Sequence, residues 1–72
     1  MNTVRQTQIA AARAAAETAY APADCSHGAH MNALRAAEWA AQEAASKVAG
    51  AGVSDIAHGA AICAAYRYNS SS

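Results

Sequence analysis

Residues 33–48 read ALRAAEWAAQEAASKV, and seven of these sixteen residues are alanines. Alanine is the best helix former, because its side chain loses no conformational entropy on entering a helix. At about 100° per residue, one stripe of this helix is apolar and the opposite side is polar. The apolar stripe consists of Leu34, Ala37, Ala41, Ala44 and Val48. The stretch therefore predicts an amphipathic helix with one face against a core.

The rest of the 72-residue chain has the same character. Alanine supplies 24 of the residues, phenylalanine is absent, and leucine, isoleucine and valine together number only seven. No segment alternates apolar and polar residues as a strand does. We predict an all-α fold, a small three-helix bundle with alanine-lined tight packing, in which residues 1–72 form a single domain.

Helix boundaries follow from capping and breaking residues. A proline disfavours helical geometry in the residue before it, so Pro22 ends a first helix over about 3–20. Asp24 or Ser26 is expected to cap a second helix over about 26–49. Glycines in GAG, residues 50–52, break that helix. Ser54 is expected to cap a third helix over about 54–67, and the tail 69–72 is expected to be frayed.

The third helix carries apolar side chains around its whole circumference, including Ile56, Ile62 and Tyr66. A helix that is apolar all round is expected to be buried. A chain of this length can build only a small core, so two alanine-rich helices cannot easily enclose the third. We therefore expect association with a second copy or with another protein.

Charge and hydropathy exclude several classes of function. Five basic and five acidic residues are scattered along the chain, with no basic stripe for phosphates, so we expect no direct nucleic-acid binding. The sequence contains no apolar run long enough to span a bilayer and no signal peptide, which predicts a cytoplasmic protein without membrane contact. Cys25 and Cys63 are then expected to be free thiols, although a bridge between them is geometrically allowed.

Residues 21–30, APADCSHGAH, raise the question of a metal site. Zinc needs four converging ligands, and Cys25, His27 and His30 could supply three at the start of the second helix. Only one of His58 and Cys63 could join them, because five residues place the two about 140° apart on a helix. We favour a simpler interpretation without a cofactor, in which the histidines are partly solvated and Cys25 packs as a small hydrophobic residue.

The same residues could form a nucleophile and its base. A helix N-terminus would favour the Cys25 thiolate, and His27 or His30 could accept its proton. Alanine-walled helices, however, offer no evident substrate pocket or oxyanion hole. We therefore predict no catalytic residues and a protein that is not an enzyme.

Trp39 is the strongest candidate for contact with a partner. It lies on the polar side of its helix, almost opposite Leu34 and Val48, with Arg35 and Glu43 one turn away on either side. An exposed tryptophan beside an arginine is typical of binding hot spots. The alternatives are that another helix covers Trp39 or that Arg35 stacks on its ring. The predicted partner-binding residues are Trp39, Arg35, Glu43, Ile62, Tyr66 and Tyr68, the last two of which could instead fill the core.

His58 has two interpretations. An exposed imidazole could pair with Asp55 three residues earlier, or it could be buried in a contact surface. In the second case association would depend on pH near the ordinary histidine pKa of about 6.5.

Residues 11–20, AARAAAETAY, and residues 33–45, ALRAAEWAAQEAA, resemble in composition the short alanine-rich helical proteins of phages and mobile elements, including anti-CRISPR inhibitors and immunity proteins. The resemblance implies a non-enzymatic inhibitor or modulator that sterically blocks a partner protein or complex. Two alternatives stay open. One is a homo-oligomeric bundle that binds a small ligand or zinc through Cys25, His27 and His30, and the other is a structural subunit of a larger assembly.

Overall fold

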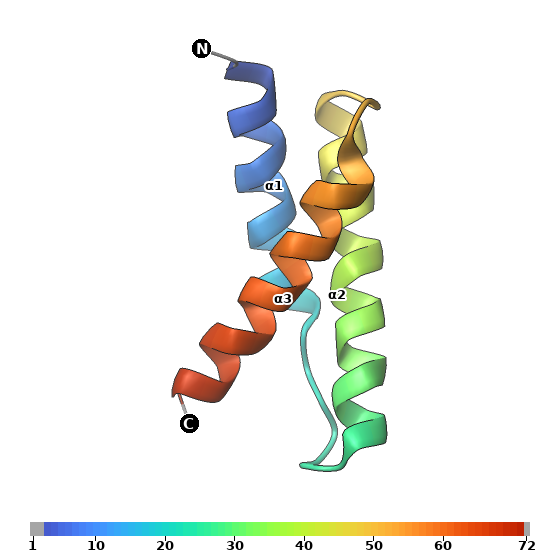
Figure 1. The fold of residues 1–72 in the computed structure, drawn as a ribbon, viewed down its shortest axis with the longest axis vertical. Helices are drawn as coiled ribbons and strands as arrows, with labels where there is room; N and C mark the ends of the chain where they lie inside the picture. The colour runs from blue at the N-terminus through green and yellow to red at the C-terminus, as the bar shows by residue number, and fades with distance from the viewer. Residues whose placement is uncertain (1–2, 72) are drawn as a thin grey trace.

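The computed structural model describes residues 3–71. It consists of three helices, α1 (Thr3–Ala19), α2 (His27–Val48) and α3 (Val53–Ser71), and every pair of helices is in contact. Helices α1 and α2 run antiparallel, and α3 crosses in front of them from the top of α2 to the lower end of α1 (Figure 1). No strand occurs within residues 3–71. The predicted all-α three-helix bundle is confirmed.

The start of α2 follows the predicted capping chemistry. The hydroxyl oxygen of Ser26 accepts a hydrogen bond from the backbone N–H of Ala29 at 3.1 Å. Asp24 supports this cap from outside the helix, since its carboxylate accepts the Ser26 N–H at 2.7 Å. Together these bonds satisfy donors that the first turn of a helix would otherwise leave without partners.

Helix α3 begins at Val53, one residue earlier than predicted. Gly52 adopts a φ of +70°, a left-handed conformation that favours glycine, and this lets the chain reverse direction quickly. Val53 is consequently turned into the core as the first residue of α3, with Asp55 in the first turn. The prediction that Ser54 caps this helix is therefore wrong, because Ser54 already lies inside it.

The C-terminal end of α3 also differs. The predicted helix ends near Arg67 with a frayed tail, whereas α3 continues to Ser71. The ring of Tyr68 packs edge-on against the ring of Tyr20, with 5.3 Å between centroids. This contact holds the last turns of α3 against the end of α1. The sequence alone gave no reason to extend the helix past Arg67. Residue 72 of the predicted tail lies outside the described residues.

The core is built almost entirely from methyl groups. Eleven of the fourteen buried hydrophobic residues in the described chain are alanines, and the others are Tyr20, Val53 and Ile56. On α2 the buried positions are Ala33, Ala37, Ala41 and Ala45. The predicted stripe was correct at its centre, but Leu34 is only partly buried and Val48 is exposed. Alanine side chains at these contacts are small, which lets the helices of the bundle approach closely.

Helix α3 is not buried on all sides, contrary to the simplest interpretation of its sequence. It buries Val53, Ile56 and five alanines against α1 and α2. Its outer side exposes Asp55, His58, Gly59, Ile62 and Tyr66. The helix therefore presents to solvent a mixed surface on which two large apolar side chains stand beside polar ones.

Candidate functional site

Trp39 lies on the outer side of α2. It lies two positions from both Ala37 and Ala41, which places it about 200° round the helix from these buried alanines. The indole is 66% exposed, so neither α1 nor α3 covers it. The predicted position of Trp39 on the polar side is confirmed.

Arg35 and Glu43 are exposed on the same side of α2, one turn from Trp39. Within residues 3–71 the Trp39 ring makes no aromatic or cation–π contact, and Arg35 makes no ion pair. Arg35 therefore does not stack on the indole. Most of the ring is open to a partner, and the guanidinium and carboxylate on either side are exposed. We call Arg35, Trp39 and Glu43 the α2 surface.

The three predicted residues of α3 are not equivalent. Tyr66 is 75% exposed and Ile62 is 50% exposed. Tyr68 is 47% exposed, but its ring packs against Tyr20 and so contributes to the end of the core. The structure thus places Ile62 and Tyr66 on an exposed surface and leaves Tyr68 with a mainly structural contact. Ile62 and Tyr66 lie on α3 and Trp39 lies on α2, so we treat them as parts of two different surfaces.

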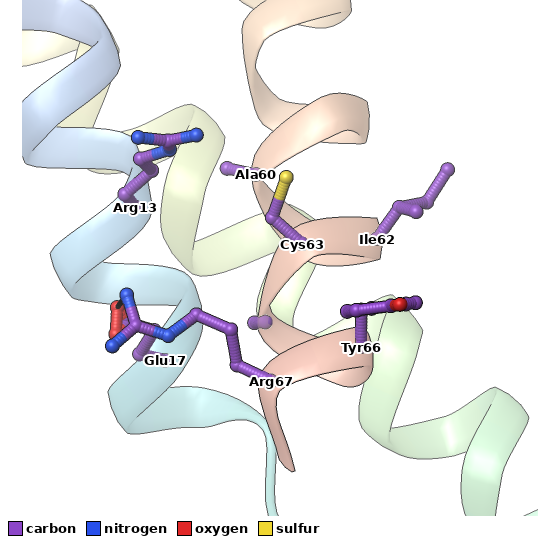
Figure 2. Close-up of a pocket in the computed structure, with 8 residues that line it drawn as sticks. Arg13, Glu17, Ala60, Ile62, Cys63, Tyr66 and Arg67 are labelled. Atoms are coloured by element: carbon purple, nitrogen blue, oxygen red, sulfur yellow. Dashed lines mark hydrogen bonds and ion pairs between the residues drawn. The ribbon is translucent and has the colours of Figure 1, made fainter. Parts of the chain in front are cut away.

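A groove of about 390 Å³ runs between α1 and α3 (Figure 2). Its apolar lining comes from α3, in Ala60, Ile62, Cys63, Ala64 and Tyr66, and its charged rim from both helices, in Arg13, Glu17 and Arg67. Arg67 donates to the Glu17 carboxylate at 3.4 Å. This ion pair is exposed, so it contributes little to stability.

Arg13 lies on the same wall of the groove as Glu17, one helical turn earlier (Figure 2). A spacing of four residues on a helix allows an ion pair between Arg13 and Glu17, but Glu17 binds Arg67 instead. Arg13 makes no hydrogen bond or ion pair with any residue of the described chain. Its guanidinium is therefore a free cation at the edge of an apolar groove.

The candidate zinc ligands do not form a cluster that could hold an ion. Cys25, His27 and His30 line a shallow hollow of about 630 Å³ beside the loop between α1 and α2. Within residues 3–71, however, no group of three or more metal-binding side chains is close enough to hold an ion. His30 Nδ1 is instead hydrogen-bonded to the Tyr20 hydroxyl at 2.6 Å.

His58 is exposed, as in the first interpretation, but it does not pair with Asp55: its Nδ1 lies 2.9 Å from a carboxylate oxygen of Glu38, which joins α3 to α2. Cys25 does not pack as a small hydrophobic residue, because it is exposed in the loop, whereas Cys63 is half-buried. The two cysteines are free, as predicted.

Gln8 is a structurally important residue that the sequence interpretation missed. It is only 3% exposed, and its side-chain nitrogen donates to the backbone carbonyls of Ala49 and Ala51. The signal was present in the spacing, because Gln8 precedes Ala12, Ala16 and Tyr20 at intervals of four and so lies on the buried face of α1. A polar residue on that face is buried and needs partners.

No family model, curated protein or solved structure matches this chain. Across residues 3–71, none of the helices has the length and apolar character needed to cross a bilayer.

Proposed function

We propose that this chain is a non-enzymatic interaction protein that binds another protein or protein complex through the α2 surface and thereby blocks access to it. One observation supports the proposal above others: the bundle places its single tryptophan, 66% exposed, on the surface, while alanines form the core. A small domain with so few large apolar residues gains most stability by burying them. Leaving Trp39 in solvent is therefore a cost that binding would offset.

The chemistry of the α2 surface agrees with such a role. Tryptophan and arginine are the residues most enriched at the centres of protein interfaces. Trp39 supplies a large rigid ring, while Arg35 and Glu43 supply hydrogen-bonding groups that fix the register of a partner. The compositional resemblance to small inhibitors of phages and mobile elements supports steric blocking as the mode of action, in the cytoplasm of the producing or infected cell.

The test is affinity capture by the purified chain from its native host, in wild type and two variants. Trp39→Ala removes the proposed contact, and Val48→Ala removes another exposed apolar side chain of α2, on the opposite side from Trp39. We expect one macromolecule to be retained by wild type and Val48→Ala, and to bind Trp39→Ala at least about tenfold more weakly, as for a hot-spot residue. Equal retention by all three chains would contradict the proposal.

A further inference from the structure

We propose that a second copy of this chain packs across α3 in antiparallel orientation, about a two-fold axis that passes beside Ile62 and Cys63. This proposal concerns a different surface from the α2 surface and does not depend on it. A two-fold interface must be self-complementary. Each feature of the surface must therefore fit the feature that the two-fold rotation brings opposite it. The outer side of α3 and the neighbouring wall of α1 meet this requirement in shape and in charge.

The complementarity of shape involves Gly59 and Tyr66. These residues are seven apart, two turns along the same side of α3. A Cβ atom built at Gly59 meets no other atom within 4 Å, and Gly59 lines a hollow of about 220 Å³ between α3 and α1, which we call the notch. Tyr66 is the most exposed of the large apolar side chains, at 75%. An axis midway between them places the Tyr66 ring of each copy over Gly59 of the other, with Ile62 packed near the centre.

The complementarity of charge involves Arg13 and Glu17 on α1. Arg13 lies level with Ala60, and Glu17 lies level with Arg67, farther along the groove (Figure 2). An axis at the height of Ile62 and Cys63 reverses this order in the second copy. Arg13 then faces Glu17 of the second copy, and the same pair forms again on the symmetry-related side.

The complementarity of shape on α3 and the complementarity of charge on α1 both require a two-fold axis at the same height along the groove. The Arg13 guanidinium has no partner within the described chain, and the Glu17 carboxylate has only the exposed contact with Arg67. One helix face with a rim from α1 makes a small interface, so we expect a dissociation constant in roughly the micromolar range. Trp39, which points away from the core, stays exposed in the dimer.

The experiment is sedimentation equilibrium of the purified chain from roughly 1 μM to 1 mM, which brackets the expected constant. Gly59→Leu places a side chain in the notch, and its Cβ meets no other atom within 4 Å. Gly28→Leu is the matched control, because a Cβ at this helical glycine of α2 also meets nothing within 4 Å. We expect Gly59→Leu to weaken dimerisation at least about tenfold and Gly28→Leu to leave it unchanged, with both variants fully helical by circular dichroism.

A charge swap tests the contact across the axis. Arg13→Glu brings two acidic side chains together, and Glu17→Arg brings two basic ones together, so each single variant weakens the dimer. Because Arg67 of the same chain pairs with Glu17 and would repel an arginine at that position, all charge variants also carry Arg67→Ala. In this background the double variant Arg13→Glu with Glu17→Arg restores opposite charges across the axis and recovers most of the affinity. A loss of fold would not be rescued in this way.

Three results would overturn the proposal. The first is a wild-type chain that stays monomeric over the whole concentration range. The second is a dimer that Gly59→Leu affects no more than Gly28→Leu does, since the contact would then lie elsewhere. The third is a double charge swap that is as weak as its single variants. None of these results depends on whether the α2 surface binds another protein.

Discussion

The side-chain nitrogen of Gln8 on α1 lies 2.7 Å from the backbone oxygen of Ala49 and 3.2 Å from that of Ala51, so one buried amide fastens the turn between α2 and α3 to the first helix. Replacing Gln8 with leucine keeps the volume but leaves these carbonyls without their donor. We expect a loss of about 1–3 kcal/mol in the free energy of unfolding, measured by urea denaturation. Gln6→Leu, at an exposed position, should change it by less than about 0.5 kcal/mol.

Gln8→Glu keeps the shape of the side chain and changes only its ability to donate hydrogen bonds. An ionised carboxylate cannot donate to the two carbonyls, whereas a protonated one can donate to one of them. We therefore expect this variant to be less stable relative to wild type at pH 7 than at pH 4. Because glutamate has nearly the same volume as glutamine, a Gln8→Glu variant as stable as wild type at both pH values would show that Gln8 acts through its volume and not as a donor.

The Tyr20 hydroxyl and His30 Nδ1, 2.6 Å apart, join the end of α1 to the first turns of α2. Tyr20→Phe removes this hydrogen bond and keeps the ring that packs against Tyr68. The expected loss is about 0.5–1.5 kcal/mol in the free energy of unfolding. Tyr68→Phe is the control, because its hydroxyl has no hydrogen-bond partner in the described chain and its change should lie within about 0.5 kcal/mol.

The alanine core should resist larger side chains. Ala37 and Ala41 are fully buried where α2 meets its neighbours. Ala37→Leu must force the helices apart, which we expect to cost about 1–3 kcal/mol or more. Ala14→Leu, at an exposed position of α1, should be nearly neutral. Thermal unfolding compares them, and an unchanged midpoint for Ala37→Leu would mean that the helices are not packed closely.

Trp39→Ala should leave the fold intact. The indole is mostly in solvent and makes no ring contact in the described chain, so its removal should change the free energy of unfolding by less than about 0.5 kcal/mol. Urea denaturation followed by circular dichroism measures this change. A larger loss would mean that Trp39 stabilises the bundle, and the capture experiment would then need a milder substitution.

The carboxyl group of Asp24 should titrate at low pH. The Ser26 hydroxyl and then the Ser26 backbone N–H donate to it, which holds its pKa below the ordinary value of 3.8. Because the folded pKa is lowered, the contribution of Asp24 to stability is present above the unfolded value and is lost as pH falls through the folded value. An NMR titration should show a midpoint below 3.8 that rises in Ser26→Ala. A midpoint at or above 3.8 in the wild type would contradict this interpretation.

Local chemistry made much of the fold predictable. Alanine content indicated helices, Pro22 and the glycines of residues 50–52 indicated where two of them end, and Ser26 indicated where α2 begins. The spacing of Trp39 from the apolar stripe predicted its exposure. These inferences succeeded because helix propensity, capping and periodicity act over a few residues and do not depend on the rest of the chain.

Contacts between distant residues were decided only by the tertiary structure. Glu17 lies four residues from Arg13 but binds Arg67, and His58 lies three residues from Asp55 but binds Glu38. In both cases the crossing of α3 over its neighbours brings a competing charge within reach, which no local spacing encodes. The same crossing places Tyr68 on Tyr20 and so extends α3 past Arg67. The sequence by itself determined the three helices and the outward position of Trp39, whereas the packing of α3 decided which side chains meet.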